Sequence, residues 1–279
     1  MKPKAYLDKG AIGVIRMNLF AEFGWDLCYS EATLMDMKND RTSSHERELD
    51  ALSDSKALYL FRDGKQVLSR SGDSREEFAR TDRLEVEVMA NLYRFINGGG
   101  PEHSLWDVLQ AQIDRFSADD PPLRSVFESV ETARITDAER IQMQEQLASD
   151  LRRGQQRATK SWNQNATATL ADVFEAHPKM CKEIEGIFPK TPGDFEQVHV
   201  ATMMLGALQL GQDKGITSPQ EDRSRGAAER GYIDCLHIAF GLHCDLFITN
   251  DKATFRRFQL LNDFWKLGKI VRYLGKQIP

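Results

Sequence analysis

The chain has 279 residues, of which 41% are hydrophobic and 28% are charged. This balance is typical of a folded globular protein and excludes an intrinsically disordered chain. The formal net charge of −5 provides no general basic surface, so any contact with a nucleic acid has to come from a local basic patch.

The N-terminal residues and the cysteines both bear on location. Charged side chains interrupt residues 1–17, so we predict neither a secretory signal nor a membrane span there. No pair of cysteines has the two-residue spacing of a zinc knuckle or a thioredoxin motif; the four are Cys28, Cys181, Cys235 and Cys244. We therefore expect reduced, mostly buried thiols, a cytoplasmic location and no contact with a membrane.

The N-terminal part predicts a strand, a helix and a second strand. Residues 4–7 are a short apolar run that ends at Asp8, residues 10–23 have a helical pattern, and residues 25–29 favour another strand. A helix over residues 31–38 follows, with Ser30 as its N-cap, and this helix carries Asp36.

The middle of the chain changes character after a predicted hairpin. Residues 56–61 and 66–69 flank an Asp-Gly pair, which favours a tight turn between two strands. From residue 76 to about residue 215 the pattern is mainly helical, broken by glycine- and proline-rich stretches. We interpret residues 76–215 as a helical insertion or cap.

The C-terminal part alternates between helix and strand. It predicts helices over residues 227–242 and 252–261 and strands over residues 246–249 and 269–274. Such alternation implies a mostly parallel sheet. We therefore predict an α/β fold with a discontinuous core, formed by residues 1–75 and 216–279.

Four aspartates occupy positions where such a sheet can hold a ligand. Asp8 and Asp251 follow predicted strands at their carboxyl ends, where open parallel sheets form their ligand crevice, and Asp36 and Asp234 approach from helices. Oxygen ligands select hard cations, so the set predicts Mg²⁺ or Mn²⁺. Any one of these aspartates alone is more simply a helix cap or turn residue, Asp251 above all.

The segment from 231 to 255 carries the most specific pattern. It reads Gly-Tyr-Ile-Asp-Cys-Leu-His-Ile-Ala-Phe-Gly-Leu-His-Cys-Asp-Leu-Phe-Ile-Thr-Asn-Asp-Lys-Ala-Thr-Phe. This resembles the C-terminal signature of PIN-domain nucleases, where a helical aspartate, a helix rich in Ala and His, a turn, a strand and Thr-Asn-Asp follow in order. Residues 5–8 resemble the family's first strand with its metal-binding aspartate, and residues 30–36 resemble its serine-to-acid helix.

The resemblance implies a PIN-like sheet flanked by helices and a metal-dependent active site. Its catalytic and metal-binding carboxylates are then Asp8, Asp36, Asp234 and Asp251, with Ser30, Thr249 and Asn250 in supporting roles. Candidate contacts to substrate phosphates are Arg223, Arg225, Arg230 and Lys9. A solvated helix face is the simpler explanation of the three arginines.

Three other residues of this segment are assigned structural roles. Asp245 precedes the strand at 246–249 and so lies at the opposite end from Asp251, where a turn or cap is expected. His237 and His243 are expected to be structural, since a helix that faces a core commonly buries a hydrogen-bonded histidine.

By the same resemblance we expect a phosphodiester hydrolase, an endoribonuclease acting on single-stranded or structured RNA. A DNA-acting PIN-like nuclease stays open, because nothing in the sequence reports contact with a 2′-hydroxyl group. A catalytically weakened nucleic-acid-binding module also stays open, because the family usually has Thr or Ser where this chain has Lys9 and Glu where it has Asp36. A homo-oligomer and an antitoxin-like protein partner are compatible with the sequence but not indicated by it.

Overall fold

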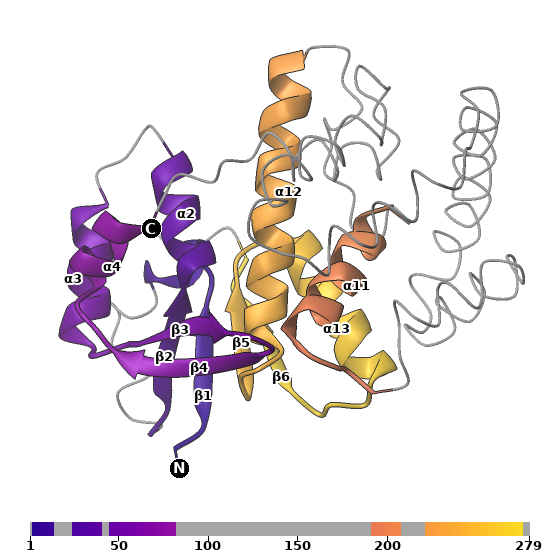
Figure 1. The fold of residues 1–279 in the computed structure, drawn as a ribbon, viewed down its shortest axis with the longest axis horizontal. Coiled ribbons are helices and arrows are strands. Elements are labelled where there is room, and N and C mark those ends of the chain that lie inside the picture. The colour runs from indigo at the N-terminus through magenta and orange to yellow at the C-terminus, as the bar shows by residue number, and fades with distance from the viewer. Residues whose placement is uncertain (1, 14–23, 41–44, 82–190, 208–220, 276–279) are drawn as a thin grey trace, which may run out of the picture.

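The sheet is the centre of the fold. A computed structural model describes residues 2–13, 24–40, 45–81, 191–207 and 221–275. Within them, six strands are arranged in the order β4-β3-β2-β1-β5-β6. They are β1 (Lys4–Leu7), β2 (Asp26–Ser30), β3 (Leu58–Asp63), β4 (Gln66–Ser71), β5 (Leu246–Thr249) and β6 (Ile270–Tyr273). Neighbouring strands are parallel except for the β3–β4 hairpin, which confirms the predicted α/β class with a mostly parallel sheet (Figure 1).

Helices lie on both faces of this sheet. They are the 3₁₀ helix η1 (Lys9–Ala11) and the α-helices α2 (Glu31–Asn39), α3 (Glu46–Asp54), α4 (Ser74–Arg80), α11 (Phe195–Ala207), α12 (Glu221–Gly241) and α13 (Lys252–Phe264). Successive side chains of a strand point to opposite faces, so alternate residues enter cores on the two sides of the sheet. Tyr6 and Phe247 belong to the core shared with α11, α12 and α13, while Tyr29 and Tyr59 belong to the core shared with α2 and α3.

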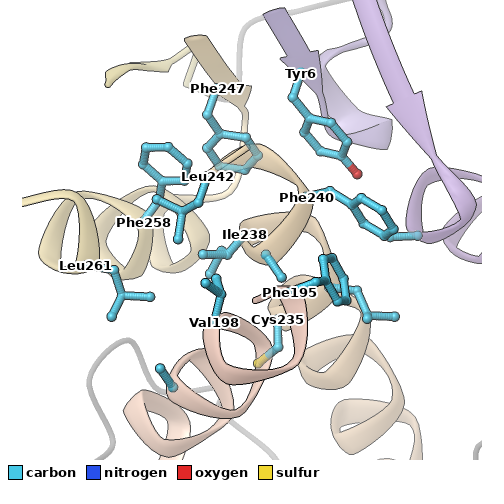
Figure 2. Close-up of a cluster of buried hydrophobic side chains, with 14 of the residues drawn as sticks. Tyr6, Phe195, Val198, Cys235, Ile238, Phe240, Leu242, Phe247, Phe258 and Leu261 are labelled. Atoms are coloured by element: carbon cyan, nitrogen blue, oxygen red, sulfur yellow. The ribbon is translucent and has the colours of Figure 1, made fainter. Parts of the chain in front are cut away.

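The first of these cores is rich in aromatic side chains. Tyr6 projects from β1 into it beside Phe240 of α12 and Phe247 of β5, with both rings stacked on the Tyr6 ring (Figure 2). Phe195 of α11 approaches Phe240 to a ring-centroid distance of 4.6 Å. Large buried aromatic rings contribute much of the energy of such a core, so α11 and α12 are firmly attached to the sheet.

Most predicted elements are confirmed, with some changes of boundary. The strands at residues 4–7 and 246–249 have the predicted ends, and the hairpin turns at Gly64, whose φ of 59° suits glycine. The helix α12 begins at Glu221, six residues before its predicted start at 227, and α13 continues to Phe264. Of the helix predicted over residues 10–23, residues 14–23 lie outside the described residues, and the described part begins as η1.

The predicted insertion is described only in part. Residues 82–190 and 208–220 lie outside the described residues, so the helical insertion over 76–215 and its limits stay a prediction. Within that range, α11 packs into the same core as α12. Of the helices that the structure describes, none has the length and apolar character needed to cross a membrane.

Candidate functional site

The carboxyl ends of β1 and β5 place two of the predicted aspartates near each other. The strands are parallel neighbours with Leu7 opposite Ile248, and the backbone N–H of Asp8 donates to the Ile248 carbonyl at 3.2 Å. Asp8 thus follows β1 directly, and Asp251 follows the end of β5 by two residues. This is the sheet edge at which parallel folds hold ligands, as predicted for both residues.

Asp8 is a buried carboxyl group, with 6% of its surface exposed. It caps η1, since its Oδ1 accepts the backbone N–H of Ala11 at 2.8 Å. Burial raises the pKa of Asp8 from 3.8 to about 7; hydrogen bonds from the Thr249 side chain and from Ala11 oppose the rise, and the charges of Asp36 and Asp251 add to it. Asp36 and Asp251 therefore lie close enough to Asp8 to affect its ionisation.

Asp36 reaches this region from α2, whose start is fixed by a capping box. The Ser30 side chain accepts the Ala32 N–H, and the Thr33 hydroxyl accepts the Ser30 N–H, as the predicted N-cap requires. The pKa of Asp36 is raised, chiefly by burial. The positive charge of Lys9 is the largest influence that lowers it, so Lys9 also lies beside the acidic groups.

Lys9 is paired with a different carboxylate. Its Nζ lies 2.6 Å from Asp40 Oδ2, just after the end of α2, and both side chains are partly buried. The predicted contact between Lys9 and a substrate phosphate thus competes with an internal ion pair. The same pair joins the turn after β1 to the end of α2.

Asp251 has a structural role that the sequence already suggested. It is exposed and caps α13, with its Oδ1 accepting the Thr254 N–H at 2.6 Å. The buried Thr249 hydroxyl accepts the Asp251 N–H at 2.9 Å, so Thr249 holds both aspartates. The exposed Asn250 lies against η1, where a Cβ atom added at Gly10 would stand 2.1 Å from the Asn250 Oδ1.

Asp234 lies half-buried on α12, which contacts both β1 and α2. On that helix Arg230 precedes it by one turn and His237 follows it by one turn, so the three residues share a face. The charge of Arg230 lowers the pKa of Asp36, and His237 contacts Tyr6 of β1. The face of α12 that carries Asp234 is therefore turned toward β1 and α2.

The remaining predicted residues are placed as follows. Arg230 is exposed at the edge of the acidic region, whereas the side chains of Arg223 and Arg225 lie outside the described residues. Asp245 lies at the opposite edge of the sheet, as predicted, where it accepts the Lys4 N–H at 2.9 Å. Cys28, Cys235 and Cys244 are buried, as predicted, and form no disulfide among the described residues, while Cys181 lies outside them.

His237 is buried and hydrogen-bonded, as predicted, but sequence reasoning missed the polar network to which it belongs. The Tyr6 hydroxyl lies 2.7 Å from Ser30 Oγ and 2.8 Å from His237 Nδ1. Burial lowers the pKa of His237 to about 3, with the charge of Lys9 adding to the effect, so its ring is neutral at pH 7. The signal was present, because a phenol in an otherwise apolar buried strand needs a polar partner.

The described residues contain no group of three or more His, Cys, Asp or Glu side chains close enough together to hold one metal ion. The acids that meet at this edge thus influence each other's ionisation without forming a closed cage. No known protein family, curated protein or solved structure matches this chain.

Proposed function

We propose that this protein is a divalent-metal-dependent nuclease with a PIN-like core, and that its active site lies at the carboxyl edge of the sheet. One observation carries the proposal. Asp8, Asp36 and Asp251 come from three separate segments; burial raises the pKa of Asp8 to about 7, and the charges of Asp36 and Asp251 add to the rise. Buried carboxyl groups with raised pKa values, here Asp8 and Asp36, at the ligand-binding edge of a parallel sheet are typical of a functional site.

The donors that this edge offers suit Mg²⁺ or Mn²⁺. They are carboxylate oxygens, with hydroxyl and amide oxygens from Thr249 and Asn250 nearby. Mg²⁺ usually keeps several water molecules and is held by one or two carboxylates, so it needs no closed cage of protein groups. Asp8 and Asp234 are the proposed direct ligands, and Asp36 and Asp251 are proposed ligands or groups that orient water.

In the proposed reaction, the side chains of the protein orient the metal-binding carboxylates and hold the substrate phosphate. When bound, the divalent ion supplies positive charge for the phosphoryl oxygens and activates water for attack. Arg230, exposed one turn before Asp234, is placed to hold a neighbouring phosphate. Thr249 and the N–H of Ala11 hold Asp8 in one orientation through hydrogen bonds to its carboxylate.

RNA is the proposed substrate, and DNA is the alternative. RNA is preferred on the resemblance to PIN-domain nucleases alone. The net charge of −5 means that a nucleic acid has to be attracted locally, and Arg230 is an exposed cation beside this edge.

The Lys9–Asp40 pair supports a second candidate, a nucleic-acid-binding module with weakened chemistry. Lys9 brings a fixed positive charge beside Asp36 and so partly offsets the negative charge that would attract a metal ion. Lys9→Ser separates the two candidates. If Lys9 weakens the site, this variant binds Mn²⁺ more tightly than the wild type and cleaves faster.

The test is cleavage of labelled single-stranded RNA and DNA of matched sequence, with Mn²⁺, with Mg²⁺ or with EDTA. We expect metal-dependent cleavage by the wild type and its loss in Asp234→Asn, which keeps the size of the side chain and removes its charge. Asp245→Asn is the matched control, because Asp245 belongs to the same sequence segment but lies at the opposite edge of the sheet.

Either of two results would contradict the proposal. One is a folded wild-type protein that binds Mn²⁺ and cleaves neither nucleic acid, which favours the binding module. The other is equal cleavage by Asp234→Asn and by the wild type, which removes this edge as the active site.

A further inference from the structure

The Tyr6 hydroxyl joins three elements at one point. Tyr6 lies on β1, Ser30 ends β2 and caps α2, and His237 lies on α12. All three side chains have 1% or less of their surface exposed. Asp8 directly follows β1, and α2 and α12 carry Asp36 and Asp234.

The hydrogen bonds of this network follow from the available protons. Ser30 Oγ accepts the Ala32 N–H at 3.1 Å, and its own proton has the Tyr6 oxygen as a partner at 2.7 Å. If Ser30 donates to Tyr6, the Tyr6 hydroxyl donates to His237 Nδ1 at 2.8 Å. This assignment gives each hydroxyl proton a close acceptor and leaves the ring proton of His237 on Nε2.

His237 depends on Tyr6 for its orientation. Its Nε2 is buried and has no hydrogen-bond partner among the described residues. The bond at Nδ1 is therefore the polar contact of this ring, and it links the turn of α12 that follows Asp234 to β1. A buried polar group held by one bond is sensitive to the loss of that bond.

We propose that Tyr6, Ser30 and His237 are positioning residues of the acidic site. Through Ser30 the Tyr6 hydroxyl fixes the start of α2, and through His237 it fixes α12, so that Asp36 and Asp234 keep a set spacing from Asp8. This inference rests on the proposed metal-dependent function. Groups that orient the residues around a metal typically change metal affinity or activity by about 10- to 100-fold when they are removed.

Tyr6→Phe tests the inference, because it removes the hydroxyl and keeps the ring that stacks on Phe240 and Phe247. The readout is Mn²⁺ binding, which is measured from the electron paramagnetic resonance signal of the free ion. Circular dichroism verifies that the variant is folded. We expect Mn²⁺ affinity to fall by about tenfold or more. The metal concentration that gives half-maximal cleavage should rise by the same factor.

Tyr29→Phe is the matched control. Tyr29 is a fully buried tyrosine on the adjacent strand β2, it belongs to the core on the other face of the sheet, and its hydroxyl has no hydrogen-bond partner in the described residues. Removing that hydroxyl should leave Mn²⁺ affinity unchanged. A general effect of deleting a buried phenol oxygen would weaken binding in both variants and would overturn the inference.

His237 provides a second test that does not depend on the folding of Tyr6→Phe. In His237→Asn the amide oxygen can take the place of Nδ1 and accept the Tyr6 proton, whereas His237→Leu offers no acceptor. We expect His237→Asn to bind Mn²⁺ within a few-fold of the wild type and His237→Leu to bind at least about tenfold more weakly. Equal affinities of the two variants would overturn the inference.

The outcomes separate this inference from the proposed function. If the wild type does not bind Mn²⁺, the proposed function and this inference fail together. If the wild type binds Mn²⁺ and cleaves, and folded Tyr6→Phe binds with the same affinity, the inference alone fails.

Discussion

Asp8 links the ionisation of one residue to the stability of the metal-free protein. Its pKa is about 7 in the folded chain against 3.8 for an unperturbed aspartate, so the folded state holds a proton that the unfolded state releases between these values. A group of this kind stabilises the fold below the lower pKa, and that stabilisation is lost as the pH rises through about 7. The free energy of unfolding should therefore fall between pH 4 and pH 7 in EDTA.

Urea denaturation at several pH values checks this prediction. The neutral Asp8→Asn side chain can still accept the Ala11 N–H, so the variant keeps the cap and loses the titration. We expect its stability to change less with pH than that of the wild type, by a difference of a few kcal/mol, since each pKa unit corresponds to about 1.4 kcal/mol. Parallel pH curves for the two proteins would show that Asp8 is ionised throughout.

The substitution Gly10→Ala tests the close contact between the segments that follow β1 and β5. A methyl group there meets the Asn250 side chain, which is exposed and can swing away, so Gly10→Ala should cost little stability. If Asn250 supports Asp251 or a ligand, its displacement should lower kcat/KM by about tenfold. Adding Gly10→Ala to Asn250→Ala should then have no further effect, and additive losses in this double-mutant cycle would contradict the coupling.

At the scale of one element, helix α13 separates a capping role for Asp251 from a metal-binding role. Serine is a good N-cap and has no carboxylate, so Asp251→Ser should retain stability and lose metal-dependent cleavage. Asp251→Ala has neither a capping group nor a carboxylate. Its free energy of unfolding should be about 1 kcal/mol lower than that of the wild type. Thermal unfolding and cleavage assays on the two variants give the comparison.

The serine variant decides the role of Asp251. Cleavage by Asp251→Ser at the wild-type rate would identify Asp251 as a helix cap only, the role that its hydrogen bond to the Thr254 N–H already supports. It would also leave Asp8, Asp36 and Asp234 as the carboxylates of the site.

The elements that sequence reasoning placed well have strong local signals. The buried strands β1 and β5 are short apolar runs that end at polar residues, and α2 begins at a serine N-cap. The helix α3 was missed because it begins after His45, which forms no capping hydrogen bond through its side chain. The early start of α12 was missed because residues 221–230 are mostly charged or small and lack an apolar period.

Contacts between distant segments account for what the sequence could not predict about the site. Strand ends can be recognised locally, so the placement of Asp8 and Asp251 at one sheet edge was predictable from the pattern. The bond between Tyr6 and His237 joins residues 231 positions apart, and the pair of Lys9 with Asp40 joins η1 to the end of α2. Neither has a sequence period or spacing that would reveal it.

At the scale of the whole molecule, a metal ion and a proton compete for the carboxylate of Asp8. Metal ligands have to be deprotonated, so a ligand with a pKa of about 7 binds a metal more weakly below that pH. An ion that binds only the folded state also stabilises it, by about 2.7 kcal/mol at a concentration 100 times its Kd. The stabilisation by Mn²⁺ should therefore be larger at pH 8 than at pH 6.

Thermal unfolding at a fixed Mn²⁺ concentration measures this coupling without any substrate. We expect the rise in Tm on adding Mn²⁺ to increase from pH 6 to pH 8 in the wild type. The rise should be small at both pH values in Asp234→Asn, while Asp245→Asn should behave as the wild type, because Asp245 lies at the far edge of the sheet. A rise in Tm that is the same at both pH values would mean that Asp8 is not among the groups that bind the ion. In that case the proton on Asp8 and the metal ion would not compete for the same carboxylate.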